Sequence, residues 1–249
     1  MRNYISFSGI LLSLLMSTGC EKPKTKEETV KTSDTINTKT KIPEKEIASA
    51  LIKNKPTDFV PKSYVVFDKI FGDLNKDGSQ DCVLIIKGTD KSNIITDEYR
   101  GVLDRNRRGI IILLNKNGIY ELATKNYDCF SSENEDGGVY YAPELDFGIE
   151  KGNLLVNYAH GRYGYWSYTF RYQNNDMELI GYDSSENRGP VTQYQTSINY
   201  LTKTKIVNEN MYKDFDTEDE VFQETVTKIN RAKLTKLSEI KDFDELDEE

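Results

Sequence analysis

The sequence predicts a mainly β protein built from antiparallel sheets, and three observations indicate this class. Short apolar runs rich in Ile, Val and Leu are bounded by Gly, Asp and Asn. Later segments alternate apolar and polar residues with a period of two, which is typical of strands with one buried and one solvated face. Polar turns rich in Asn separate these segments. We therefore expect an antiparallel meander, arranged as a sandwich or as a partial, propeller-like set of blades.

The earlier strands are predicted from the apolar runs, which cover residues 64–70, 82–87 and 109–114. Asn117-Gly118 follows the third run, and Asn-Gly is a strong hairpin signal because both turn residues take a positive φ. We expect this turn to join 109–114 to a strand at 119–124.

The later strands are predicted from alternation, and they cover residues 154–158, 166–172 and 194–200. In the second of them the aromatic side chains occupy one face and Ser167, Thr169 and Arg171 the other. The turn Asn174-Asn175-Asp176 is expected to join this strand to the next one.

A short helix is predicted near each end of the folded part. Pro43-Glu44 suits the start of an N-terminal helix, because Pro is favoured at the first helical position. Residues 217–220 fit a capping box, in which Thr and Glu satisfy each other's backbone donors. Phe222, Val226 and Ile229 follow at helical spacing and indicate a C-terminal helix.

The N-terminus has the pattern of an export signal. An apolar run at residues 5–16 is too short to span a bilayer but suits the apolar region of a secretory signal. Ser17-Thr18-Gly19-Cys20 resembles the lipobox of bacterial lipoproteins, although that family usually has Leu where Ser17 stands. The resemblance implies that Cys20 carries acyl chains such as palmitate and anchors the chain to the outer membrane of the cell envelope. The alternative is an ordinary cleaved signal that leaves Cys20 a thiol.

These patterns divide the chain into four parts. Residues 1–19 are the expected signal peptide, and residues 20–42 form a tether rich in Lys, Glu and Thr. The tether has too few apolar residues to offset its ordering entropy, so we expect it to be disordered. Residues 43–210 form the β-rich domain, and 211–249 form an acidic C-terminal extension that packs in part.

The charge of the chain argues against one class of partner. Its net charge is −8, and the 13 acidic and 6 basic residues of the C-terminal extension contribute −7 of it. The remainder has no excess of Lys and Arg with which to neutralise phosphates, so we expect no nucleic-acid partner.

Two cysteines remain if Cys20 is lipidated, Cys82 and Cys129. An exported protein folds in an oxidising compartment, where such a pair can form a disulfide. The alternative is two buried free thiols, because free Cys is among the most buried residue types.

An acidic turn stands directly before the strand predicted at 82–87, with the pattern Asp73-x-Asn75-x-Asp77-Gly78-x-x-Asp81. A hard cation such as Ca²⁺ takes six to eight oxygen ligands, and alternate side chains in a curled loop can converge on one point. An EF-hand requires Glu at the twelfth position, which is Leu84 here, so the loop is not an EF-hand. The alternative is a polar turn in which Asp and Asn cap their own backbone.

With the preceding Phe-Gly and the strand that follows, this turn resembles the calcium loops of FG-GAP or VCBS-type repeats, which build β-propeller blades. The resemblance covers residues 71–87 and occurs once. It implies a structural Ca²⁺ ion with the following ligands: Asp73, Asn75, Asp77, Ser79 and Asp81. In composition the whole chain also resembles uncharacterised lipoproteins of Bacteroidota.

The segment 160–168 contains the only His and the only Trp of the chain, together with several Tyr and two Gly. His160, Tyr163 and Tyr165 are candidate contacts for a sugar ring or a protein partner, because aromatic side chains dominate such contacts. Trp166 fits the inward face of its own strand and is assigned to the core.

The sequence favours a non-catalytic, calcium-stabilised binding or interaction module of the cell envelope. No nucleophile elbow, phosphate-binding Gly loop or His-based metal cluster is present in the sequence. One alternative is an inhibitor or immunity-type protein that acts on a protein partner, and another is a carboxylate-dependent hydrolase. Arg100, Arg105, Arg107 and Arg108 could receive an anion or pair with the excess acids.

Overall fold

The computed structural model describes residues 51–135, 142–212 and 220–246. The chain divides into two units, 1–41 and 42–249, and every described residue belongs to the second. The predicted signal peptide, Cys20, the tether and the start of the N-terminal helix therefore lie outside the described residues.

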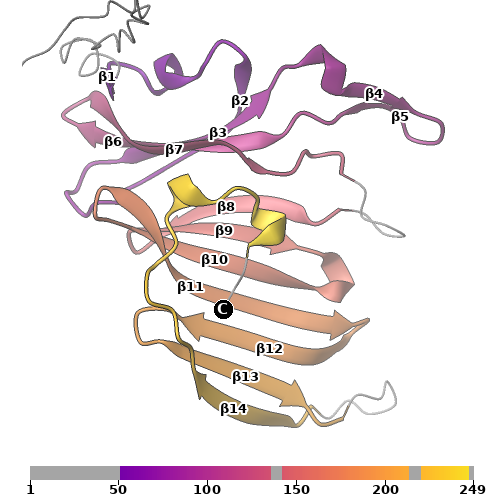
Figure 1. Ribbon diagram of the computed structural model, residues 1–249. Helices are drawn as coiled ribbons and strands as arrows, with labels where there is room; N and C mark the ends of the chain where they lie inside the picture. Colours follow the sequence, from indigo (N-terminus) through magenta and orange to yellow (C-terminus); the bar gives the residue numbers. More distant parts are fainter. Residues whose placement is uncertain (1–50, 136–141, 213–219, 247–249) are drawn as a thin grey trace, which may run out of the picture. The chain divides into compact units, whose positions relative to one another are not determined.

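The described residues form three antiparallel sheets, which confirms the predicted mainly β class (Figure 1). The first sheet has the order β1-β7-β6-β3-β2 and contains β1 (Ile52–Lys53), β2 (Tyr64–Gly72), β3 (Asp81–Gly88), β6 (Arg108–Lys116) and β7 (Ile119–Phe130). The second is a sequential meander of seven strands: β8 (Glu144–Glu150), β9 (Asn153–Ala159), β10 (Gly164–Gln173), β11 (Asp176–Arg188), β12 (Val191–Asn199), β13 (Thr204–Asn210) and β14 (Phe222–Lys228). A separate hairpin pairs β4 (Ile94–Asp97) with β5 (Gly101–Asp104). No helix in the described part of the chain is long and apolar enough to cross a membrane.

The two hairpin turns predicted from Asn-rich dipeptides are confirmed. Asn117 and Gly118 have φ of 55° and 86° in the turn between β6 and β7. Asn174 and Asn175 have φ of 52° and 58° between β10 and β11. Positive φ at both central residues gives a turn whose twist matches the twist of the flanking strands.

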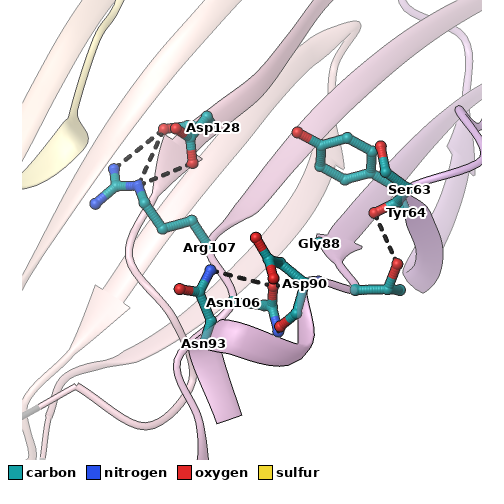
Figure 2. Close-up of a pocket in the computed structure, with 9 residues that line it drawn as sticks. Ser63, Tyr64, Gly88, Asp90, Asn93, Asn106, Arg107 and Asp128 are labelled. Atoms are coloured by element: carbon teal, nitrogen blue, oxygen red, sulfur yellow. Dashed lines mark hydrogen bonds and ion pairs between the residues drawn. The ribbon is translucent and has the colours of Figure 1, made fainter.

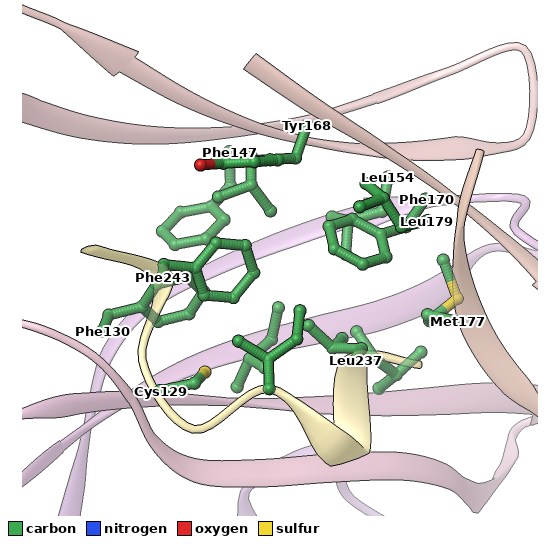
Figure 3. Close-up of a cluster of buried hydrophobic side chains, with 14 of the residues drawn as sticks. Cys129, Phe130, Phe147, Leu154, Tyr168, Phe170, Met177, Leu179, Leu237 and Phe243 are labelled. Atoms are coloured by element: carbon green, nitrogen blue, oxygen red, sulfur yellow. The ribbon is translucent and has the colours of Figure 1, made fainter. Parts of the chain in front are cut away.

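Both large sheets contribute to one hydrophobic core (Figure 3). The first sheet contributes alternate residues of its central strands, such as Val83 and Ile85 of β3. The second contributes Leu154 and Val156 of β9 and the aromatic face of β10. The apolar residues that alternate along the predicted strands therefore face the other sheet, as expected for strands with one buried face.

The predicted C-terminal helix is wrong, because Phe222–Lys228 is strand β14. This strand pairs with β13, and Val226 stands opposite Ile206. The segment 222–228 also has apolar and β-branched residues that suit a strand, and the free edge of β13 gives it a partner. Beyond it the chain returns to the core through two 3₁₀ turns, η4 (Leu237–Glu239) and η5 (Phe243–Glu245).

Cys82 and Cys129 are both buried free thiols, so the disulfide considered from the sequence is not formed. Cys129 belongs to the core shared by the two sheets. Cys82 belongs to a smaller cluster with Phe59, Leu84 and Ile111. Cys82 and the core residue Val83 are neighbours on β3, and successive side chains of a strand point to opposite faces, so the two thiols lie on different faces of the first sheet.

Candidate functional site

The acidic turn is the loop between β2 and β3, and hydrogen bonds to its own backbone fold it tightly. The carboxylate of Asp73 accepts a bond from the N–H of Asp77 at 3.1 Å and another from the N–H of Gly78 at 3.0 Å. Lys76 and Gly78 have φ of 63° and 86°, and this left-handed backbone curls the loop around the Asp73 carboxylate.

Asn75, Asp77 and Ser79 continue the same network. The Asn75 side-chain amide donates to Oδ2 of Asp77 at 2.8 Å, and the Ser79 N–H donates to Oδ1 of Asp77 at 2.7 Å. The hydrogen bond from Ser79 favours the charged form of Asp77 and holds the pKa of this exposed carboxyl below its ordinary value.

Asp81 has a different environment, because it is fully buried at the start of β3. Its two carboxylate oxygens accept bonds from the N–H of Leu74 at 2.8 Å and from the N–H of Asn115 at 2.9 Å. Burial raises the pKa of Asp81 above its ordinary value. Leu74 is buried in the shared core, so Asp81 ties the loop both to that core and to β6.

The structure therefore joins Asp73, Asn75 and Asp77 in one exposed network, while Asp81 is buried at the start of β3 and bonds to backbone N–H groups of the same loop. In the described ranges no group of three His, Cys, Asp or Glu side chains is placed to hold a metal ion. The donor set itself suits a hard cation, since the oxygens of Asp73, Asn75 and Asp77 share one exposed turn. The backbone caps formed by Asp and Asn are also those expected of a polar turn.

His160 and Tyr163 line a cavity of about 450 Å³ at the end of the second sheet. They stand around the 3₁₀ turn η3 (Gly161–Tyr163), and their ring centroids are 5.3 Å apart. The guanidinium of Arg162 lies 5.3 Å from the centroid of the Tyr163 ring, and its Nε donates to the Tyr163 hydroxyl at 3.1 Å. Tyr165 is half exposed and does not line this cavity.

Arg105 and Arg107, two of the arginines singled out in the sequence, form ion pairs with acids. Arg105 forms an ion pair with Glu135 at 3.0 Å. Arg107 pairs with Asp128 at 3.0 Å and with Asp242 at 2.9 Å. Pairing with the excess acids, one of the two roles considered from the sequence, is therefore observed for Arg105 and Arg107.

A cavity of about 490 Å³, which the sequence did not predict, lies beside Arg107 (Figure 2). Its polar groups bond largely to one another. The N–H of Asp90 donates to Oδ1 of Asn106 at 2.9 Å, and the Asn106 amide donates back to the carbonyl of Asp90 at 3.0 Å. These residues come from separate loops, so no local motif marks them.

Comparisons of this chain with protein families, with curated proteins and with solved structures find no match. The resemblance to FG-GAP or VCBS-type loops therefore rests on residues 71–87 alone.

Proposed function

We propose that this chain is a non-catalytic binding module of the cell envelope, anchored through lipid on Cys20 and stabilised by a calcium ion. The observation that carries the binding role is the cavity beside His160 and Tyr163. Ligand pockets are commonly lined by aromatic side chains with a few polar groups, and His160 and Tyr163 provide two such rings here. Tyr165 stands outside the lining and is not part of the proposed contact.

The chemistry of this cavity favours a glycan. An aromatic ring packs against the C–H face of a sugar, and the neighbouring polar groups bond its hydroxyls. Arg162 and Glu144 also line the cavity and supply a donor and an acceptor beside the rings.

The binding role is tested on a glycan array with the Cys20→Ser chain, which carries no lipid. We expect selective glycan binding that Tyr163→Ala abolishes. Tyr165→Ala is the matched control, since it removes a neighbouring Tyr that does not line the cavity. Absence of glycan binding by the Cys20→Ser chain, or equal binding by the Tyr163→Ala variant, contradicts the proposal.

The proposed calcium ion has a structural role. Asp73, Asn75 and Asp77 would hold it through side-chain oxygens, and Ser79 through its carbonyl oxygen. A bound ion that prefers the folded state stabilises that state by mass action. The Asp81 carboxylate is already bonded to two backbone N–H groups and positions the loop.

The calcium proposal is tested by thermal melts in Ca²⁺ and in chelator, together with a calorimetric titration. We expect Ca²⁺ to raise the melting temperature of the wild type and of Asp146→Ala, which removes an exposed carboxylate on β8. Asp77→Ala should lose the rise. Identical melts of the wild type in both conditions, with no heat of binding, would make the loop a polar turn only.

A protein partner is the second candidate, and the hairpin of β4 and β5 favours it. Tyr99 in its turn is 90% exposed and Val102 on β5 is 72% exposed. Exposed aromatic and apolar side chains on a hairpin suit a protein interface. A pulldown from envelope extract that depends on Tyr99 and not on Tyr163 would favour this candidate over the glycan.

A further inference from the structure

A third cavity, of about 490 Å³, lies between strands of both large sheets. Its walls include Phe67 from β2, Arg108 from β6, Tyr158 from β9 and Trp166 from β10. Asp244 of η5 closes one side. The first sheet, the second sheet and the C-terminal turn η5 therefore all contribute to the wall of one cavity.

Arg108 is a buried cation, and none of the described carboxylates forms an ion pair with it. The residue is 6% exposed, and its guanidinium lies 5.3 Å from the centroid of the Phe67 ring. Its Nε donates to the carbonyl of Ser131 at 2.9 Å, and one terminal nitrogen donates to the carbonyl of Ser132 at 3.4 Å. Among the described residues it forms no ion pair, unlike Arg105 and Arg107. A buried charge normally has a counter-charge, and this guanidinium still has N–H donors with which to bind an anionic group.

Tyr158 places a hydroxyl in the same cavity wall that has no hydrogen-bond partner among the described residues. The residue is 3% exposed. Burial raises the pKa of this hydroxyl, so it stays a donor at neutral pH. Its ring stacks on Trp166 with centroids 5.1 Å apart, and this contact fixes its position in the cavity wall. Buried polar groups are normally bonded, so an orphaned hydroxyl beside a cavity points to a ligand atom.

Four acidic residues line the cavity, and only two of them form ion pairs with described basic residues. Glu133 pairs with Lys87 at 3.1 Å and Glu135 pairs with Arg105 at 3.0 Å, so their charges are compensated. The other two, Glu144 and Asp244, form no ion pair with any described residue. A simple anion would meet Arg108 but would be repelled by these two carboxylates. A simple cation would pair with these two carboxylates but would be repelled by Arg108.

We propose that this cavity binds a small zwitterion, either an amino acid or a short peptide with free ends. Its carboxylate accepts hydrogen bonds from Arg108 and Tyr158. Its ammonium pairs with Glu144 or Asp244. This arrangement gives the Tyr158 hydroxyl a hydrogen-bond partner, gives Arg108 an ionic partner in addition to its two carbonyls, and gives one of the two acids a counter-charge.

The apolar walls select the side chain of this ligand. Phe67 and Trp166 line the cavity beside the charged groups and offer ring surface to an apolar group. The volume of about 490 Å³ is within the range of small-molecule sites and suits one or two residues of peptide.

This cavity adjoins the one beside His160 and Tyr163, because Ala142 and Glu144 line both. The proposal goes beyond the glycan-binding role, and the two are separated by variants. Tyr163→Ala removes a ring from the cavity beside His160 only, and Tyr158→Phe removes a hydroxyl from the cavity beside Arg108 only.

The test screens the twenty standard amino acids and the twenty Gly-Xaa dipeptides against the Cys20→Ser chain by thermal shift and calorimetry. We expect at least one to bind with 1:1 stoichiometry. Blocking either end of that ligand, by N-acetylation or C-amidation, should weaken binding by about tenfold or more, as expected for loss of a charged contact.

Tyr158→Phe is the decisive variant, because it removes one oxygen atom that has no partner and keeps the ring. It should weaken binding of that ligand about tenfold, the factor for one lost hydrogen bond, with the fold intact by circular dichroism. Tyr64→Phe, at the cavity of Figure 2, is the matched control and should bind like the wild type. The proposal is overturned if no member binds, if blocked ligands bind equally well, or if Tyr158→Phe binds as the wild type does.

Discussion

Phe130 of β7 and Phe243 of η5 stack with their ring centroids 4.6 Å apart. Phe243 also makes edge contacts with Tyr168 and Phe170 of β10, at 5.3 and 6.0 Å. The ring of Phe243 therefore lies between an aromatic residue of the first sheet and two of the second (Figure 3). The acidic C-terminal segment thus supplies a central side chain of the shared core.

Phe243→Ala should strongly destabilise the fold. The side chain is 2% exposed, and its removal leaves a cavity between the two sheets. Deletion of a buried Phe costs about 3–5 kcal/mol of unfolding free energy. Urea denaturation followed by circular dichroism measures this loss. Val226→Ala on β14, where Val is 55% exposed, is the control and should change little. A loss below about 1 kcal/mol for Phe243→Ala would show that the core does not depend on this segment.

Gly164 at the start of β10 should tolerate no side chain. Its φ is +115°, and a Cβ at this position would lie 1.7 Å from the carbonyl oxygen of Ser185. We expect Gly164→Ala to lose more than about 4 kcal/mol or to fail to fold.

The matched control for this change is Gly118→Ala, in the turn between β6 and β7. Gly118 also has a positive φ, +86°, but an added Cβ meets no atom within 4 Å. Only the backbone strain remains, so a loss of about 1 kcal/mol is expected. Thermal melts of the two variants compare them directly, and equal losses would refute the steric argument.

Both thiols of the folded domain should be unreactive. Burial raises the pKa of Cys82 to about 11, and burial also raises that of Cys129. We expect a thiol-specific chromogenic reagent at pH 8 to label neither cysteine until the Cys20→Ser chain is unfolded in guanidinium. A reductant should leave the melting temperature unchanged. Rapid labelling of the native protein, or a lower melting temperature in reductant, would contradict the free and buried state of the two thiols.

Local sequence patterns predicted much of the fold because the determining physics is local. Alternation along β9 and β10 marks residues such as Leu154 and Phe170, which bury one face. Asn117-Gly118 predicts its hairpin because few other residues adopt positive φ at low cost. The segment 222–228 was assigned wrongly, because its apolar spacing fits a helix as well as a strand. The free edge of β13 decides in favour of the strand, and a neighbouring strand cannot be read from the segment itself.

The candidate sites divide in the same way. The turn around Asp73 and Asp77 is continuous in sequence, so its network of oxygens could be recognised from spacing. The cavity around Arg108 and Tyr158 could not be, since strands of two sheets and the turn η5 bring its residues together. The cluster of four arginines was visible, but which of them lacks an acidic partner depends on the tertiary fold.

Asp244 should make the fold less stable as the pH rises from acid to neutral. Burial, its first cause, and the nearby charge of Asp242 raise the pKa of the Asp244 carboxyl above its ordinary value of 3.8. Below that value the carboxyl is protonated in both the folded and the unfolded states, and it contributes no pH dependence. As the pH rises through the window between the two values, the folded state holds the proton more tightly, so its stability falls.

Asp244→Asn removes this titration, so its melting temperature relative to the wild type should increase from pH 3.5 to pH 7. Asp146→Asn controls for the loss of one negative charge at an exposed position on β8. A zwitterion bound in the cavity would bring an ammonium beside Asp244 and favour its charged form. Saturating ligand should therefore reduce the difference between the wild type and Asp244→Asn at pH 7. If the two curves run parallel over the whole range, the pKa of Asp244 is the same in the folded and unfolded states, and its surroundings in the fold do not raise it.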